Sequence, residues 1–363
     1  MATITKSLIS GLTDQMVQCR LNKVDAKQFL YGYHFPVKRI VGFNWKTLTN
    51  QLSALNVAAD VHADNGTIVR KKRPNFEIAS GDLPFVAISR EKTRSELKDY
   101  QTAAGLAQGA DATALVDFWG EDVDFCFTGV NSELEYIAWA ATSNACKLAF
   151  TTGNNATFAN QFDLDYKVAD TQKKYTATDW NNPSTADVIG DLRTLVKAAK
   201  AMKLNPKFAF INLDEAYRIC SAEQIIKACA SFAANALNIS QTPTMEQVNQ
   251  MLARQAWLNG IQFRVIDQTI TREAQDGTQT SANPFADRRL VLSETERLGT
   301  TQYDVLNENA PAILRATRSH VTVKKYGTIE PTTEVTIGEA DAIPVIDTAY
   351  RNIYVKTDGN AWS

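Results

Sequence analysis

The 363-residue chain is poor in the residues and motifs that build metal and catalytic sites. It has only three histidines, His34, His62 and His320, and none lies at ligand spacing from a second histidine or a cysteine. The glycine-rich loops of nucleotide-binding proteins and the Gly-x-Ser-x-Gly loop of hydrolases are missing from the sequence. We therefore expect no catalytic residue, no cofactor and no metal, and we predict that the protein is not an enzyme.

Long apolar runs, paired cysteines and a large net charge are also missing. No run approaches the roughly 18 apolar residues of a membrane span, and the N-terminal residues lack the basic and apolar regions of a signal peptide. The five cysteines include no Cys-x-x-Cys pair, which favours a reducing cytoplasm. The formal net charge of −2 argues against a general affinity for polyanions.

The clearest positive signal is a helical pattern over residues 131–150. Ser132 followed by Glu135 matches a capping box, which predicts that a helix begins there, and the glycine and asparagines at 153–155 predict its end. Apolar residues follow at helical spacing on more than one face, which is typical of a helix buried on more than one side. We predict a central spine with the C-terminal strands packed against it and with a core made of Leu134, Ile137, Trp139 and Leu148.

Residues 1–78 predict two segments that protrude. Residues 1–35 contain a weakly amphipathic helix and an aromatic cluster, and we expect an arm that needs a partner surface because its apolar content is low. Residues 36–48 and 67–78 have strand-like patterns, and Asn65-Gly66 between them is a strong turn signal. A long hairpin with few apolar residues is marginally stable alone, so we expect Phe43 and Trp45 to contact another chain.

The remaining sequence alternates helical and strand-like patterns without a regular βαβ series, which indicates an α+β fold. Helices are predicted at 188–202, at 215–230 with Asp214 as its cap, and at 245–258. Strands are predicted at 208–213, 261–266 and 288–292, with a hairpin-like loop at 271–283 and further strands after His320.

Charged residues are unevenly distributed. Residues 66–98 contain eight Lys or Arg and four acids, whereas residues 111–135 contain seven acids and no Lys or Arg. The basic run could be a nucleic-acid patch or a solvated surface, but we favour complementary surfaces that meet between subunits. The residues expected to make these contacts are Arg70, Lys71, Lys72 and Arg73 on the basic side and Glu121, Asp122 and Asp124 on the acidic side.

The order of these segments resembles the major capsid proteins of tailed bacteriophages, which have the Hong Kong 97-type fold, in the branch of the phage lambda major head protein. The resemblance covers most of the chain from about Pro36 onward and depends on order and spacing. It is carried by the segments 83–92 (LPFVAISREK), 205–215 (NPKFAFINLDE), 260–266 (GIQFRVI) and 289–292 (RLVL), together with Glu135-x-x-x-Trp139 and Trp180-Asn-Asn-Pro183.

The resemblance implies an N-terminal arm at 1–35, an E-loop at 36–90, a P domain at 91–185 and 313–363 and an A domain at 186–312. It further implies self-assembly, as hexamers and pentamers, into an icosahedral shell that encloses double-stranded phage DNA without reading its sequence. Scaffolding, decoration and portal proteins would then be candidate partners, and no membrane would be involved. The protein would be located in the virion after assembly in the host bacterial cytoplasm.

Two alternatives remain open at this stage. Encapsulin-like compartments share the fold, so the shell could enclose a cargo other than DNA. A cytoplasmic α/β enzyme with an unidentified site is the alternative from another functional class. A shell protein should form very large particles or capsomers, whereas an enzyme should show a pocket of convergent polar groups.

Overall fold

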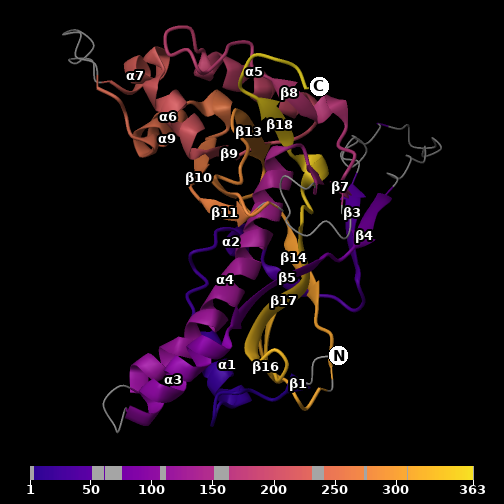
Figure 1. The fold of residues 1–363 in the computed structure, drawn as a ribbon. Helices are drawn as coiled ribbons and strands as arrows, with labels where there is room; N and C mark the ends of the chain where they lie inside the picture. The colour runs from indigo at the N-terminus through magenta and orange to yellow at the C-terminus, as the bar shows by residue number, and fades with distance from the viewer. Residues whose placement is uncertain are drawn as a thin grey trace. The chain divides into compact units, whose positions relative to one another are not determined.

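The computed structural model describes residues 4–50, 61, 76–106, 112–150, 163–230, 241–273, 276–308 and 310–362. Helices and sheets are mixed throughout, which confirms the predicted α+β class (Figure 1). The chain divides into two compact units. Unit 1 comprises Met1–Trp45, Gly81–Glu135 and Thr300–Val345, and unit 2 comprises Lys46–Ser80, Tyr136–Gly299 and Ile346–Ser363.

Unit 1 is built on a seven-stranded sheet around the long strand β17 (Thr333–Val345). β5 (Phe85–Lys92) pairs with β17 on one side. On its other side β17 pairs with two strands in turn. Its first part pairs with β16 (Val321–Thr328), and its last part, from Asp341 onward, pairs with β14 (Thr300–Asp304). The outer strands of the sheet are β1 (Ile4–Thr5), β2 (Val37–Arg39) and β15 (Leu314–Arg318).

Helix α1 (Asp14–Lys23) covers the outer edge of β15. Asp14 accepts a hydrogen bond from the backbone N–H of Arg315 at 2.8 Å. Gln18, one helical turn later, accepts from Thr317 N–H at 3.0 Å and donates to Thr317 C=O at 3.1 Å. The four residues from Asp14 to Gln18 advance about 6 Å along the helix, close to the roughly 6.6 Å of two strand residues. The side chains of α1 thus satisfy an edge that would otherwise be open to pairing.

The N-terminal residues pack on their own chain, which makes the expected partner-dependent arm wrong for the described part of 1–35. Val17, Leu21 and Phe35 have no exposed surface, and Tyr31, in α2 (Tyr31–His34), is 2% exposed. The apolar residues of this segment are few, and Met16 and Tyr33 are 40% and 57% exposed, but the buried ones pack within unit 1. A low apolar content therefore did not mean that a local surface was missing.

The spine helix is longer than predicted and begins earlier. α4 runs from Ala112 to Ser143 and follows α3 (Arg94–Leu106). The apolar pattern already present at Trp119, Val123 and Val130 extends the helix, so the expected start at Ser132 is wrong. Glu135 accepts a hydrogen bond from Tyr31 N–H at 3.0 Å instead of capping a helix.

The end of α4 also differs from the prediction, since the helix stops before residue 150. Ala145 and Cys146 adopt left-handed backbone conformations with φ of 54° and 59°. The chain then enters β6 (Lys147–Ala149), which pairs with β7 (Asp163–Asp165). The predicted terminator at 153–155 lies outside the described residues.

Unit 2 contains a five-stranded sheet in the order β10-β9-β13-β18-β8. These strands are β8 (Lys173–Tyr175), β9 (Phe208–Asn212), β10 (Gln262–Ile266), β13 (Arg289–Ser293) and β18 (Ile353–Lys356). β18 pairs with β13, so residues 346–363 belong to the unit that contains 186–299 rather than to the unit that contains 313–345. This division differs from the expected P domain, which grouped all of 313–363.

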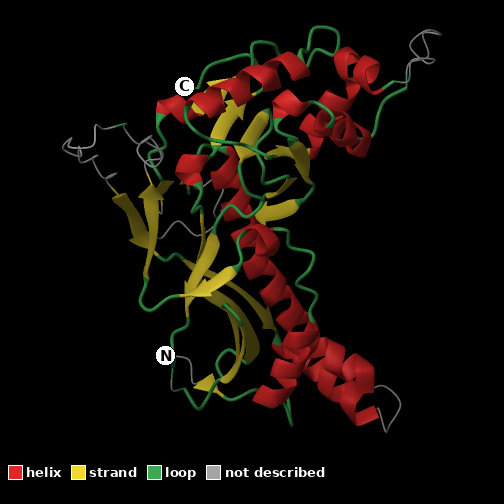
Figure 2. Cartoon of the chain, turned by 180° about the vertical axis from the view of Figure 1, so that it is seen from behind, coloured by secondary structure: helices red, strands yellow, loops and turns green. Residues whose placement is uncertain are grey.

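Helices α5 (Val188–Ala201), α6 (Leu213–Ser221), α7 (Glu223–Cys229) and α9 (Met245–Ala253) bury their apolar faces with this sheet (Figure 2). The predicted helix 215–230 is in fact α6 and α7, because Ala222 is extended between them. Asn212, not Asp214, is the cap: its Oδ1 accepts from Glu215 N–H at 2.8 Å.

The helix predicted at 245–258 ends as α9 at Ala253, followed by the 3-10 turn η3 (Ala256–Leu258). Asn259 is left-handed with φ of 58°, as expected of a helix-terminating Asn-Gly. The hairpin-like loop is confirmed as β11 (Ile270–Glu273) and β12 (Gln279–Ala282). The short 3-10 turns η2 (Asp170–Gln172) and η4 (Ala349–Arg351) also lie in unit 2.

The base of the predicted long hairpin is present as a two-stranded sheet of β3 (Asn44–Asn50) and β4 (Phe76–Asp82). The strand pattern at 36–48 is thus confirmed as β2 followed by β3. Between β3 and β4 the structure describes only residue 61. The basic run Arg70–Arg73 and the turn at Asn65 lie outside the described residues.

Candidate assembly surfaces

Phe43 and Trp45, the two aromatic residues expected to contact another chain, differ in exposure. Trp45 is 5% exposed and lies against Gly81, where a Cβ would approach the indole Nε1 to 2.9 Å. A side chain at position 81 would therefore displace the indole. The expectation that Trp45 meets another chain is wrong, because its own chain buries it. Phe43 is 50% exposed, so a contact with another chain stays a prediction for this residue.

Two carboxylates of the acidic segment bind Arg20 of α1. Its Nε donates to Asp124 at 3.0 Å and its Nη1 to Asp117 at 3.2 Å. The hydrogen bond that Arg20 donates to Asp124 raises the pKa of Arg20. Gly120 faces the same guanidinium, and a Cβ there would come within 2.9 Å of Nε. Asp124, expected at an interface between subunits, is instead paired within its own chain.

Asp122 is fully enclosed by its own chain. Its carboxylate is 1% exposed and lies 3.2 Å from Lys92 Nζ and 3.8 Å from Arg90 Nε. Both cations come from β5 and also cover rings of α4, with Lys92 over Phe118 at 4.3 Å. A buried carboxylate is stable only with such partners. The expectation that Asp122 faces a neighbouring subunit is therefore wrong. Glu121 is the exposed member of that acidic trio and forms no ion pair with a described residue.

A second buried ion pair fixes the N-terminal segment to unit 1. Lys325 and Glu334 are both 0% exposed, with 3.8 Å between Nζ and Oε1. Glu334 also accepts hydrogen bonds from the Ser7 hydroxyl at 2.5 Å and from Leu8 N–H at 2.8 Å. Burial lowers the pKa of Lys325, which Glu334 opposes. The sequence did not reveal this pair, because Lys325 and Glu334 lie on neighbouring strands. Each occupies a position that looks like an ordinary polar residue of an alternating strand.

The predicted spine residues are all buried, with exposures of 0% for Leu134 and Trp139, 1% for Ile137 and 7% for Leu148. The surroundings of Trp139 differ from the prediction, however. Its ring lies 6.2 Å from Phe210 of β9 and 6.4 Å from Phe285, both in unit 2. This part of the spine thus forms a core with the segment expected to be the A domain.

Unit 2 contains a polar cluster at the carboxyl end of β9 that the sequence did not reveal. Arg218 forms a two-pronged pair with Asp287 at 2.6 and 3.0 Å and also donates to Glu215 at 2.8 Å. Burial raises the pKa of Glu215, whereas the hydrogen bond from Arg218 lowers the pKa of Asp287. Both carboxylates hold the shared guanidinium in one orientation. The cluster therefore connects α6, through Arg218, to Asp287 in the loop before β13.

Neither a metal cluster nor a membrane-spanning helix occurs in the described part of the chain. No group of three or more His, Cys, Asp and Glu side chains is placed to hold an ion. No described helix is both long and apolar enough to cross a bilayer.

Solved structures identify the fold, although the sequence matches no protein-family model and no curated protein. A phage-related protein from Bordetella bronchiseptica RB50 matches with a TM-score of 0.52 at 12% identity, over 96% of this chain and 98% of its own. A protein described as the capsid protein of a prophage of E. coli CFT073 matches with a TM-score of 0.56 at 14% identity, over 95% of this chain and 99% of its own. The chain has the Hong Kong 97-type capsid fold that its sequence resembles.

Proposed function

We propose that this protein is the major capsid protein of a tailed bacteriophage and assembles, as hexamers and pentamers, into an icosahedral shell around double-stranded DNA. The observation that carries the proposal is the match to a prophage capsid structure over 95% of this chain and 99% of the other. A match of both chains over nearly their whole lengths means that the entire polypeptide, rather than one domain, has the architecture of a shell subunit.

The exposed apolar residues of unit 1 support a role in assembly. Tyr33, Val37, Val41, Phe43 and Phe85 are each between 46% and 102% exposed. Four of them fall within eleven residues of chain, around the edge strand β2 and the start of β3. Large exposed apolar side chains concentrated in one segment are typical of an interaction site. Copies of the same chain would bury them in a shell.

The proposed role is structural rather than catalytic, with the virion as its location after assembly in the host bacterial cytoplasm. Scaffolding, decoration and portal proteins are the expected partners besides further copies of the chain. Within the subunit, β3 and β4 would be the base of the E-loop, and the five-stranded sheet with α5 to α9 would form most of the A domain. The contact with a neighbour would then involve the hairpin beyond Asn50 and the exposed Phe43.

The test is to express the full chain and to measure its size by light scattering and electron microscopy. We expect closed shells of megadalton mass or ring-shaped capsomers. Co-expression with the other head proteins of the same phage should shift the capsomers into shells that contain DNA. A chain that remains a monomer at every concentration, with or without those proteins, would contradict the proposal. Shells that form but consistently package protein would favour a compartment instead.

A further inference from the structure

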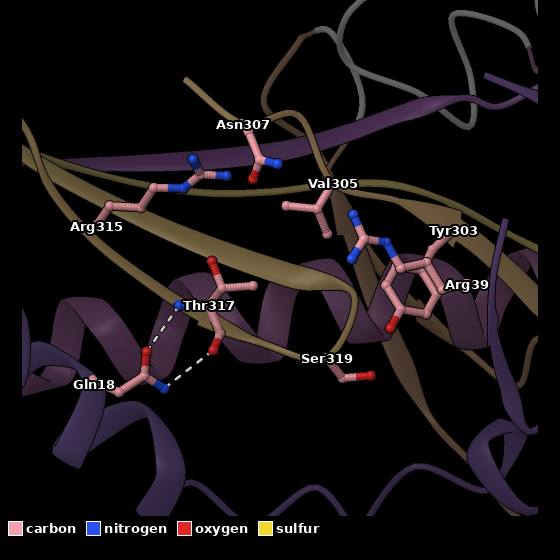
Figure 3. A pocket seen from close by; sticks show the side chains of 8 residues that line it. All are labelled: Gln18, Arg39, Tyr303, Val305, Asn307, Arg315, Thr317 and Ser319. Atoms are coloured by element: carbon pink, nitrogen blue, oxygen red, sulfur yellow. Dashed lines mark hydrogen bonds between the residues drawn. The ribbon is translucent and has the colours of Figure 1, made fainter. Parts of the chain in front are cut away.

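A polar pocket opens in unit 1 near the place where β17 changes its partner from β16 to β14. Its volume is about 480 Å³. The lining comes from α1, β2, β14, β15 and the loops that follow β14 and β15, and it contains no Asp or Glu (Figure 3). The lining residues are Gln18, Arg39, Tyr303, Val305, Asn307, Arg315, Thr317 and Ser319.

Arg315 is held in place on one wall of this pocket. Its backbone N–H is bound by Asp14 at 2.8 Å, and its Nη2 donates to the carbonyl of Leu306 at 2.5 Å. Its Nε is buried and has no hydrogen-bond partner. The guanidinium is thus anchored at Nη2 while no described carboxylate pairs with it, which leaves its charge available to an anion.

Arg39 approaches from the opposite wall. Its side chain is 60% exposed, and its closest carboxylate is that of Asp304, 3.5 Å from Nε. Asp304 is itself occupied by two backbone donors, Gly42 N–H at 3.1 Å and Val305 N–H at 2.9 Å. The two guanidinium groups lie on either side of Val305 and turn their ends toward the middle of the pocket (Figure 3).

The acids around the pocket do not fill it. Asp14 accepts from the backbone of Arg315, whereas Asp304 accepts from two backbone N–H groups and also pairs with Arg39; neither acid lines the pocket. Glu308, next to the lining residue Asn307, pairs with Lys324 at 2.6 Å. The lining therefore presents two cations and several neutral donors, among them the hydroxyls of Tyr303 and Ser319, to whatever enters.

We propose that this pocket binds a phosphate-class oxyanion between Arg39 and Arg315. A carboxylate has only two oxygens, which one guanidinium fork can satisfy, whereas a tetrahedral phosphate presents oxygens to donors on opposite walls at once. The same chemistry could reach the pocket as free phosphate or as a phosphodiester of DNA. The inference concerns unit 1 alone and does not depend on the proposed shell function.

The test is calorimetric titration of the purified full chain at low ionic strength, with inorganic phosphate in one arm and a short DNA duplex in the other. We expect Arg39→Gln and Arg315→Gln each to weaken binding at least about tenfold, the effect of losing one charge-assisted contact. If the DNA duplex binds no more tightly, per phosphate group, than inorganic phosphate does, the site is assigned to a free anion. The reverse preference assigns it to the nucleic-acid backbone.

Lys38→Gln is the matched control, because Lys38 neighbours Arg39 on β2 and carries the same charge but does not line the pocket. It should leave the affinity within about twofold of the wild-type value. Arg315→Lys, which keeps the charge and removes the fork, should weaken phosphate binding while circular dichroism and thermal melting stay unchanged. Equal losses in Lys38→Gln and Arg39→Gln, or a wild-type chain that binds neither phosphate nor DNA, would overturn the inference.

Discussion

Single residues with no exposed surface define the described core, and Trp139 is the largest of them. Its indole lies among aromatic rings from β9 and from the loop before β13, so several elements meet at this one side chain. The sequence predicted the burial of Trp139 from its helical spacing. It could not identify the partners, because Phe210 and Phe285 lie far along the chain and no local pattern links them to the spine.

Trp139→Ala should destabilise the folded chain by about 3–5 kcal/mol, because the surrounding elements cannot collapse into the space of an indole. The measurement is urea unfolding of the unassembled chain, monitored by the fluorescence of the remaining tryptophans. Trp257, which is 41% exposed, provides the matched control. Trp257→Ala should cost much less than Trp139→Ala, and equal losses would show that position 139 is not a packing centre.

Asp287→Asn should remove part of the stability at neutral pH and none in strong acid. The folded pKa of Asp287 lies below its usual value, chiefly through the hydrogen bond from Arg218. Its contribution is therefore present above the unfolded pKa of about 3.9 and is lost as the pH falls through the lower folded value. Glu215 on the same guanidinium acts in the opposite sense, because burial raises its pKa. Its contribution is present below about 4.3 and is lost as the pH rises.

The measurement for this pair is thermal melting between about pH 2 and pH 7. The gap between Asp287→Asn and wild type should be widest near neutrality and should close in acid. Asp214→Asn on the same helix, where the side chain is exposed, is the control and should follow the wild-type curve. A gap that is constant with pH would mean that Asp287 acts through packing or neutral hydrogen bonds rather than through charge.

At the scale of elements, patterns with strong local chemistry predicted the structure well. The amphipathic helix at 188–202 and the strands around 208–213, 261–266 and 288–292 are present as α5, β9, β10 and β13. The capping box at Ser132 and Glu135 failed because it lies within α4, where Glu135 serves Tyr31, 104 residues away. A motif of four residues cannot show that a distant backbone N–H competes for its carboxylate.

The same limit explains the acidic segment. Clustered acids on a helix resemble an exposed interaction surface, and only the fold shows that Asp122 lies beneath β5 and that Arg20 neutralises two others. Of the surfaces predicted from the hairpin pattern, Trp45 is buried by its own chain, and the contact at Phe43 stays a prediction. The surfaces that could not be predicted were those created by pairing across sheets and between α1 and α4.

Gln18→Ala should destabilise the chain by about 1–2 kcal/mol, because the N–H and C=O of Thr317 lose their partner at the edge of β15. Hydrogen exchange at residues 315–318 should accelerate more than exchange elsewhere in the sheet. Lys23→Ala, an exposed change on the same helix, should affect neither quantity. Unchanged exchange at β15 in Gln18→Ala would show that α1 does not protect this edge.

At the scale of the whole molecule, the chain combines internally satisfied charges with exposed apolar side chains. The buried pairs of Asp122 and Glu334 leave these two carboxylates unavailable to other molecules, whereas the exposed apolar residues of unit 1 remain available. Charged pairs at an exposed rim contribute about 0–1 kcal/mol each, whereas apolar burial contributes in proportion to area. Assembly should therefore respond more strongly to apolar changes than to charge changes.

Phe43→Ser should raise the protein concentration needed for shell formation about tenfold while leaving the subunit folded. Phe43 is 50% exposed, so its burial by a neighbour would contribute on the order of 1–1.5 kcal/mol per contact, and each 1.4 kcal/mol changes an association constant tenfold. Because every subunit repeats the contact, a small change in the free energy of one contact strongly changes the concentration needed for assembly.

Phe43→Leu retains most of the apolar area and should assemble near the wild-type concentration. The measurement is light scattering across a concentration series, with circular dichroism to verify the fold. If Phe43→Ser and Phe43→Leu assemble alike, Phe43 faces solvent in the shell and does not contribute to the contact between copies.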